Sequence, residues 1–285
     1  MEESAHILFW YGRERMKIRL RFWLPLWVFA LIVPVMLTAV IRDRSRASFL
    51  KEDIRESSLF REQELKPELY EELLKMSEAE GDFSELLTAA MLNGRMKPEK
   101  LNTDREPYLR YKREAFYQLQ KCYQAVWSDV RCFPVPSKEI SFENTWFEKR
   151  TYGGERVHEG TDLFGRNPLS GYYPVVSMTD GTVEQIGWLP LGGYRIGIRS
   201  PQGGYFYYAH LAGYEREFYR GETVQAGQIL GFMGNTGYGA EGTSGRFPVH
   251  LHLGIYISDP DGGELSVNPY WVLKASDKKI INYAY

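Results

Sequence analysis

A long apolar stretch dominates the hydrophobic pattern near the start of the chain. Residues 22–41 form a run of 20 positions without a charged side chain. As a helix this run is about 30 Å long, which equals the hydrocarbon thickness of a bilayer. Pro25 and Pro34 lie inside it, but membrane helices tolerate proline. The run predicts an uncleaved transmembrane anchor, because a signal peptide has a shorter apolar core followed by small residues. A buried core helix is the alternative.

Charged segments flank this predicted anchor on both sides. Five basic residues lie between positions 13 and 21, and five more lie between positions 42 and 55. Because the two counts are equal, the excess of basic residues that normally marks the cytoplasmic side gives no orientation. We expect residues 1–21 to form a short segment before the span. Residues 42–64 carry both signs of charge and are expected to form an exposed stalk.

Residues 65–135 carry apolar side chains at helical spacing and are expected to form a helical domain. Apolar positions recur at intervals of three and four in residues 69–76, 83–91 and 116–130. Asp82 followed by Glu85 is typical of a helix start, and Asn93-Gly94 is typical of a helix end. The pattern predicts a small bundle of three helices whose apolar stripes form its core. The alternative is that the helical domain is a spacer, which sets how far the β domain reaches or occludes its active site.

From residue 136 to residue 285 the pattern changes to short β-forming runs. Val175-Val176, Thr182-Val183, residues 194–198 and residues 205–208 are separated by glycine, proline and aspartate. This is typical of short strands joined by turns. We therefore predict a chain of the α+β class, with an N-terminal transmembrane helix, a small α-helical bundle and a C-terminal antiparallel β domain.

Charge and cysteine content narrow the choice of function. The 35 basic and 37 acidic side chains leave a net charge of −2, so the basic footprint of a nucleic-acid-binding protein is missing. Cys122 and Cys132 are the only cysteines. Ten residues of continuous helix span about 15 Å, whereas bridged Cα atoms lie about 4.4–6.8 Å apart. A disulfide would require the helix to end near Ser128 and the chain to turn back.

Four of the five histidines fall within one stretch of under a hundred residues, at positions 158, 210, 250 and 252. Zinc takes about four nitrogen, oxygen or sulfur ligands, and a catalytic site leaves one position for water. Two histidines and a carboxylate such as Asp162 satisfy this requirement. In an extended strand residues two apart share a face, so His250 and His252 are expected to point the same way.

A second interpretation treats His158-Glu159 as part of a helical H-E-x-x-H zinc motif with Glu159 as general base. That motif needs a helix. Glycines at 153, 154, 160 and 165 and Pro168 surround the segment, so its helical propensity is low. We therefore discount Glu159 as a catalytic residue.

A set of short motifs occurs in a characteristic order between about residues 140 and 275. They include His158-x-x-x-Asp162, Tyr208-Ala209-His210-Leu211, residues 221–228, His250-Leu251-His252 and Asn268-Pro269. Together they resemble the LytM or lysostaphin type of zinc peptidase, the M23 metallopeptidase family. Residues 222–231 also resemble the hairpin of lipoyl and biotinyl carrier domains. Such domains present a lysine at the hairpin tip, and no lysine lies between Arg150 and Leu273.

The M23 resemblance implies a site and a cofactor. His158, Asp162 and His252 match the ligands of Zn²⁺, and His210 and His250 match the catalytic pair. In the implied mechanism zinc activates a water molecule and polarises the scissile carbonyl, while a histidine takes and returns a proton. Tyr152 is a further candidate, for the developing oxyanion.

The resemblance also implies an activity and a location. The expected function is a membrane-anchored zinc metalloendopeptidase that hydrolyses peptide bonds in bacterial peptidoglycan. A wall-cutting domain must face the wall, so we expect a cytoplasmic N-terminus and an extracytoplasmic C-terminal domain. The expected partners are peptidoglycan peptides and, through residues 22–41, the membrane. The alternative is a non-catalytic zinc-binding envelope or wall-assembly protein on the same scaffold, in which ligands or catalytic histidines are lost.

Overall fold

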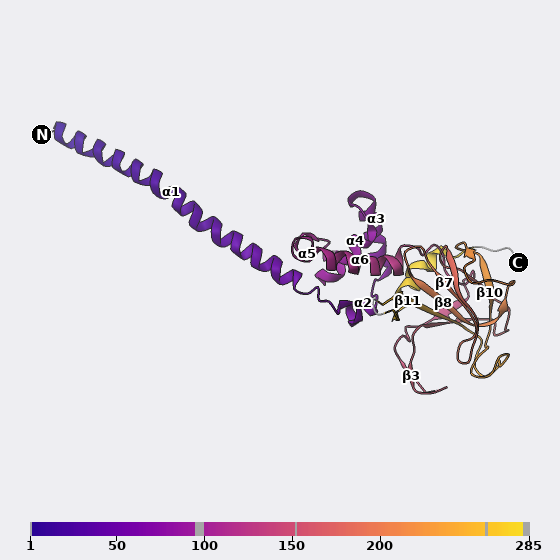
Figure 1. Ribbon diagram of the computed structural model, residues 1–285. Helices are drawn as coiled ribbons and strands as arrows, with labels where there is room; N and C mark the ends of the chain where they lie inside the picture. The colour runs from indigo at the N-terminus through magenta and orange to yellow at the C-terminus, as the bar shows by residue number, and fades with distance from the viewer. Residues whose placement is uncertain (1, 95–99, 152, 260–261, 282–285) are drawn as a thin grey trace.

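Helices make up the first part of the chain and strands the second (Figure 1). The computed structural model describes residues 2–94, 100–151, 153–259 and 262–281, without the side chains of residues 2–22 and 80. The helical elements before the strands are α1 (Glu2–Ala47), η1 (Ile54–Glu56), α2 (Ser58–Arg61), α3 (Pro67–Glu80), α4 (Phe83–Asn93), α5 (Glu106–Tyr111) and α6 (Arg113–Trp127). Helices α7 (Tyr270–Ser276) and η3 (Asp277–Lys279) follow the strands. The predicted α+β class is confirmed.

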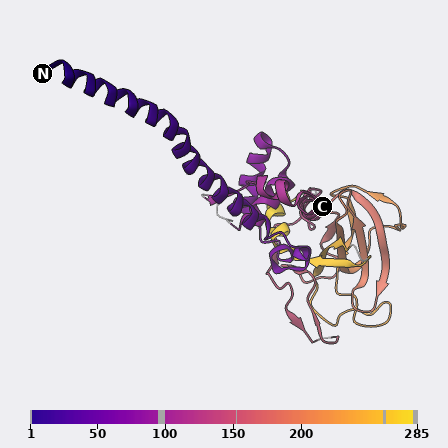
Figure 2. The same ribbon diagram turned by 60° about the vertical axis from the view of Figure 1, so that its left-hand side comes forward.

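Helix α1 extends away from the rest of the chain in both views (Figure 1, Figure 2). It continues through Pro25 and Pro34. Its segment Trp23–Ala47 is 25 residues long, has a mean hydropathy of 2.5 over its most apolar part, and is not buried there. At about 1.5 Å per residue this segment is long enough to cross a bilayer. The predicted long apolar helix is therefore present.

The charged segment that follows α1 contacts the helices at a few buried positions. Leu50 and Phe60 are buried, and the buried side chain of Gln63 accepts a hydrogen bond from the Trp127 indole at 2.7 Å. Lys112 donates to the carbonyl of Leu50. These contacts hold the segment against the helices at a few positions, and the assignment of residues 42–64 as a stalk stays a prediction.

The helical region follows the predicted pattern, with one difference. Helix α4 begins where expected, because the Asp82 carboxylate accepts from the backbone N–H of Glu85 at 3.1 Å, and it ends at Gly94, whose φ is 64°. Pro107 marks the start of the third predicted helix, but two helices follow it, α5 and α6, which are divided at Lys112, whose φ of −146° is not helical. Cys122 and Cys132 are both free. Helix α6 ends at Trp127 with Ser128 as its C-cap, so the helix end that a bridge requires is present, yet the two thiols are not joined.

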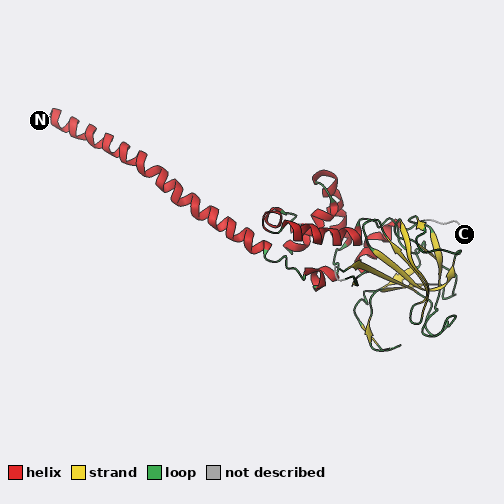
Figure 3. Cartoon of the chain, viewed as in Figure 1, coloured by secondary structure: helices red, strands yellow, loops and turns green. Residues whose placement is uncertain are grey.

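The strands form a large antiparallel sheet beside a separate two-stranded hairpin (Figure 3). The main path of the sheet has the order β1 (Ile140–Phe142), β4 (Thr161–Gly165), β11 (Leu251–Ser258), β8 (Tyr205–Tyr214), β7 (Gly193–Arg199), β6 (Gly181–Leu189) and β9 (Thr223–Val224). Off this path, β10 (Ile229–Met233) pairs with β8 and with β5 (Pro174–Val176), and β12 (Glu264–Val267) pairs with β11. The hairpin consists of β2 (Lys149–Arg150) and β3 (Arg156–Val157). Every predicted strand lies within one of these elements.

The helices and the sheet share one core. Their buried apolar side chains form a single continuous cluster. Polar contacts also join the two parts, since the Arg61 guanidinium donates to the Ser266 hydroxyl at 2.8 Å and the Asn268 N–H donates to the Arg61 carbonyl at 2.8 Å. The boundary at residues 135 and 136 stays a prediction, and the packing ties the helical region firmly to the β domain.

Candidate active site

One face of the sheet carries the candidate site. Along β11, Leu251 and Leu253 are fully buried, so His252 points to the opposite face. The strand register places His252 beside Asp162 of β4 on one side and Ala209 of β8 on the other. His250 lies just before β11 and shares the face of His252, as the period of two predicts.

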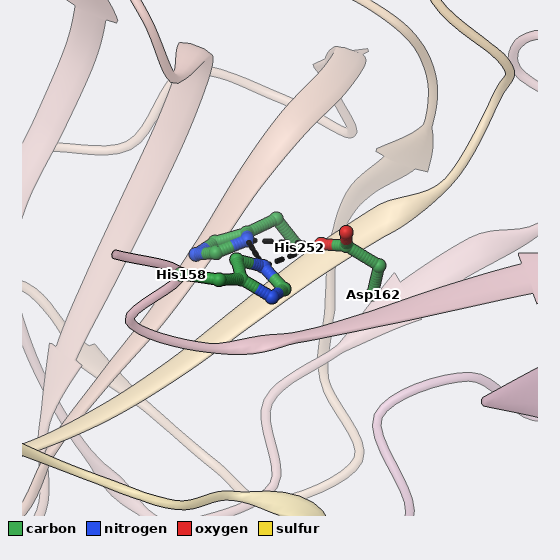
Figure 4. Close-up of side chains that lie close together, drawn as sticks. All are labelled: His158, Asp162 and His252. Atoms are coloured by element: carbon green, nitrogen blue, oxygen red, sulfur yellow. Dashed lines mark hydrogen bonds and ion pairs between the residues drawn. The ribbon is translucent and has the colours of Figure 1, made fainter. Parts of the chain in front are cut away.

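Three of the predicted side chains converge at this place (Figure 4). His158 Nε2 lies 3.0 Å from Asp162 Oδ1 and 3.1 Å from His252 Nδ1. His252 Nδ1 lies 3.0 Å from the same carboxylate oxygen. Tetrahedral zinc with ligands at about 2.0–2.1 Å holds them about 3.3 Å apart. The triangle of donor atoms therefore has nearly the size of one face of a zinc tetrahedron.

Neighbouring groups hold these three side chains in place. His158 Nδ1 lies 3.1 Å from the Thr145 carbonyl and 3.0 Å from Nη2 of Arg150, so both neighbours fix the orientation of its ring. Arg150 donates to the second carboxylate oxygen, Asp162 Oδ2, at 3.2 Å. Gly160 leaves room for the imidazole of His252, because a Cβ atom there would lie 2.6 Å from His252 Nε2.

The charge state of Asp162 suits a cation. Burial by itself raises the pKa of this carboxyl, but hydrogen bonds from His158 and His252 outweigh burial and place the pKa far below its usual range. Asp162 is therefore ionised at neutral pH. Two imidazoles and one carboxylate form a donor set that zinc commonly takes in hydrolytic sites.

A second pair of histidines lies beside the triangle. The ring centroids of His210 and His250 are 4.8 Å apart, and His250 Nε2 lies 3.6 Å from Asp162 Oδ1. His210 Nδ1 donates to the Thr236 carbonyl at 2.9 Å, and His250 Nδ1 donates to the Pro248 carbonyl at 2.8 Å. Each ring, when neutral, therefore keeps Nε2 as a proton acceptor.

Burial keeps both of these rings neutral. It lowers the pKa of His210 to about 3, with further help from the neighbouring His250 and His252. Burial also lowers the pKa of His250, against the opposing pull of the Asp162 carboxylate. In this tautomer each ring can accept a proton at Nε2, and each can donate from Nε2 only after it has been protonated.

A β-bulge aims His210 into the site. Phe206 and Tyr208 of β8 are fully buried, so simple alternation would bury His210 on the same face. Between β7 and β8 the register shifts, because Ile196 pairs with Tyr208 but Tyr194 pairs with Leu211. His210 occupies the extra position with a φ of 62°, which is rare for a residue other than glycine. The bulge thus turns its ring toward His250.

The four histidines and Asp162 line one groove of ≈ 790 Å³. Within the described part of the chain, its lining residues all fall between positions 150 and 264, so the helices described do not occlude it. Glu159 also lines the groove, but it lies outside any helix and its carboxylate accepts from Ser266, as expected for a residue without a helical zinc motif. Tyr152 lies outside the described residues.

Known proteins share both the sequence and the fold of this part of the chain. A model of peptidase family M23 matches residues 156–269, a range that holds all four histidines and Asp162. A crystal structure from Ruminococcus gnavus ATCC 29149, provisionally described as the glycyl-glycine endopeptidase LytM, is 38% identical with a TM-score of 0.71. The similarity covers 84% of this chain and 98% of that one. The chain belongs to peptidase family M23.

A curated relative of this M23 peptidase is known by its activity. The L-Ala–D-Glu endopeptidase of Bacillus subtilis (strain 168) is 42% identical over 164 residues. The match covers 57% of this chain and 49% of that protein, so the chain spans about half the length of the curated relative. The two relatives are named for different bonds, one between glycines and one beside an acidic residue.

The M23 site contains residues that the sequence motifs did not reveal. Arg150 comes eight positions before His158, and the β2–β3 hairpin brings it back to the carboxylate of Asp162. The Gly153-Gly154 pair is a hairpin signal that could have indicated this. Phe247 lies against both catalytic candidates, with ring centroids 4.7 Å from His210 and 5.2 Å from His250. No spacing rule predicts that contact.

Proposed function

We propose that this M23 peptidase is a membrane-anchored zinc endopeptidase that hydrolyses peptide bonds in bacterial peptidoglycan. The observation that carries the proposal is the convergence of His158 Nε2, Asp162 Oδ1 and His252 Nδ1 to 3.0–3.1 Å beside two neutral histidines in one open groove. The peptidase family and the endopeptidase relative supply the reaction class.

His158, Asp162 and His252 would hold the zinc ion through the three atoms that converge. A bound zinc ion supplies a Lewis acid and an activated water molecule. The side chains of the chain itself then provide the proton transfers. His250 would accept a proton at Nε2, which faces the carboxylate of the triangle at 3.6 Å. His210 would act from the other side of the pair and could stabilise a developing negative charge once it is protonated.

Arg150 is expected to support metal binding without being a ligand. Its bond to Asp162 Oδ2 leaves Oδ1 directed at the two histidines. Replacing Arg150 with methionine should weaken zinc affinity by roughly 10- to 100-fold, because groups that orient metal ligands commonly contribute that much. A competition titration against a chromophoric chelator would measure it. Lys149→Met, an exposed change on the same strand, is the matched control. Equal affinities for the two variants would contradict this role.

The activity test uses purified peptidoglycan and the full chain in detergent. Zinc-loaded protein should release new amino groups from the wall, a strong chelator should stop the release, and added zinc should restore it. Both a glycine-bridged wall and a directly cross-linked wall are needed as substrates. If neither yields chelator-sensitive release, the protein is a non-catalytic envelope component and the proposed hydrolysis is wrong.

The proposed location places the β domain outside the cytoplasmic membrane, anchored by the apolar part of α1. The support is the length and hydropathy of Trp23–Ala47 and the L-Ala–D-Glu endopeptidase activity for which the curated relative is named. Protease added to cells whose wall has been removed, with the membrane intact, should digest the β domain. The same domain should then survive only if it lies inside. Survival until the membrane is permeabilised would contradict the proposed orientation.

A further inference from the structure

An arginine outside the histidine cluster faces the same groove. Arg195 lies on β7 between Tyr194 and Ile196, and Ile196 and Ile198 are fully buried on the other face. The register shift at the bulge places Arg195 opposite Ala209 and His210 of β8, and Ala209 pairs with His252 of β11. Neighbouring strands are about 4.8 Å apart, so the backbone of Arg195 lies roughly 10 Å from that of His252.

The charge of Arg195 is not balanced within the described protein. Its Nη1 atom is buried and has no hydrogen-bond partner among the described residues. Its neighbours include the phenols of Tyr205 and Tyr207, and burial raises the pKa of both, to about 12 for Tyr205, so they stay neutral. A partly buried guanidinium without a counter-charge is unfavourable. A negatively charged ligand would remove that penalty.

Three other arginines in or near the groove each have a hydrogen-bond partner. Arg199, on the same face of β7, donates to Glu184 and to Glu264. Arg150 bonds to Asp162. Arg246 donates to the carbonyl of Tyr238 at 2.6 Å and is exposed. Like Arg150, whose Nε atom is also buried without a partner, Arg195 has a buried N–H group with nothing to donate to in the part of the chain that the structure describes. Unlike Arg150 and Arg199, it forms no ion pair with a carboxylate there.

The chemistry of Arg195 indicates what it would bind. A guanidinium presents paired N–H donors that match the two oxygens of a carboxylate. A glycine bridge has no side-chain charge to offer. A D-glutamate that is joined to its neighbours through its amine and one carboxyl keeps its other carboxylate free, close to the bond on its amino side.

We propose that Arg195 is a specificity-determining residue that binds the free carboxylate of a D-glutamyl residue next to the scissile bond, and so selects acidic stem peptides over neutral glycine bridges. The inference rests on the proposed peptidase function and deepens it by naming the substrate class. It concerns binding and orientation of the substrate, with the proton transfers left to the histidines.

A matched pair of substrates tests this assignment. The peptides L-Ala-γ-D-Glu-L-Lys and L-Ala-D-isoglutamine-L-Lys, each blocked at its N-terminus, differ only in whether the free carboxylate is amidated. The full-length zinc-loaded protein should cleave the acidic peptide with a kcat/KM roughly 10- to 100-fold above that for the amide, the range expected for hydrogen bonds to a charged group. Arg195→Gln should bring this ratio to about 1, because its kcat/KM should fall for the acidic peptide and stay unchanged for the amidated one. Arg246→Gln should keep the wild-type ratio.

Each result decides the question. Equal cleavage of both peptides by the wild type, or a wild-type ratio in Arg195→Gln, overturns the inference and leaves the peptidase function intact. Pentaglycine serves as a third peptide. If the protein cleaves pentaglycine and leaves both stem peptides intact, the inference is likewise overturned and the peptidase function stands. Failure to cleave any of the three peptides, with zinc bound, contradicts the proposed function and the inference together. If Arg195→Gln does not fold, Arg195→Lys replaces it, because lysine keeps the positive charge but lacks the paired N–H donors. Its ratio of kcat/KM values should lie between that of the wild type and 1. A ratio equal to that of the wild type refutes the assignment.

Discussion

Replacing His252 with alanine should leave a folded protein that no longer retains zinc. The variant removes Nδ1, one of the three atoms that lie 3.0–3.1 Å apart. Two ligands remain, and the affinity should fall by well over the roughly 100-fold that is typical when a supporting residue is lost. Zinc per chain after gel filtration, measured by atomic absorption, should drop from about one to a small fraction, and peptidoglycan cleavage should vanish with it.

A thermal measurement gives this prediction a second readout. A ligand that binds only the folded state stabilises it by about 4 kcal/mol at a concentration one thousand times its dissociation constant. Zinc should therefore raise the melting temperature of the wild type by several degrees, and it should leave that of His252→Ala unchanged. A variant that keeps stoichiometric zinc and the full thermal shift would show that His252 is not a ligand.

Replacing His250 with alanine should give the opposite combination. The variant should bind zinc as the wild type does, because His250 Nε2 is 3.6 Å from Asp162 Oδ1 and lies outside the triangle. Its kcat should fall by about 100- to 10,000-fold, the usual contribution of a positioned acid or base. The two variants are matched controls for each other, since the residues lie two apart on one face.

His210→Ala should resemble His250→Ala, because His210 belongs to the same pair. When two residues act in one proton relay, their effects are not additive, so the double variant should be little worse than the poorer single variant. Metal content and kcat are measured on all three proteins. Loss of zinc in His250→Ala, or losses that multiply in the double variant, would contradict the proposed pair.

Much of the fold could be predicted because its signals are local. Strands such as β7 and β8 alternate buried and less buried side chains, or carry β-branched and aromatic residues between turns that contain glycine. Helix α4 has a capping aspartate at its start and a glycine at its end. The same period of two placed His250 and His252 on one face. The convergence of His158, Asp162 and His252 followed from the order of motifs, and their roles as ligands stay a prediction.

The features that escaped prediction depend on contacts between distant residues. The bulge that turns His210 toward the groove leaves no mark in the sequence, since alternation would have buried its ring beside Tyr208. The burial of Leu50 and Phe60 within residues 42–64 is not signalled by the charge-rich composition of that segment. The unpaired N–H group of Arg195 becomes visible only when every neighbouring carboxylate has been located.

The central claim is that three side chains share one zinc ion. Diffraction from crystals of the zinc-loaded protein, recorded at the zinc absorption edge, tests it most directly. The account predicts one anomalous peak about 2.0–2.2 Å from His158 Nε2, Asp162 Oδ1 and His252 Nδ1. A peak held instead by His210 or His250, or zinc-loaded crystals without a peak at the triangle, would contradict it.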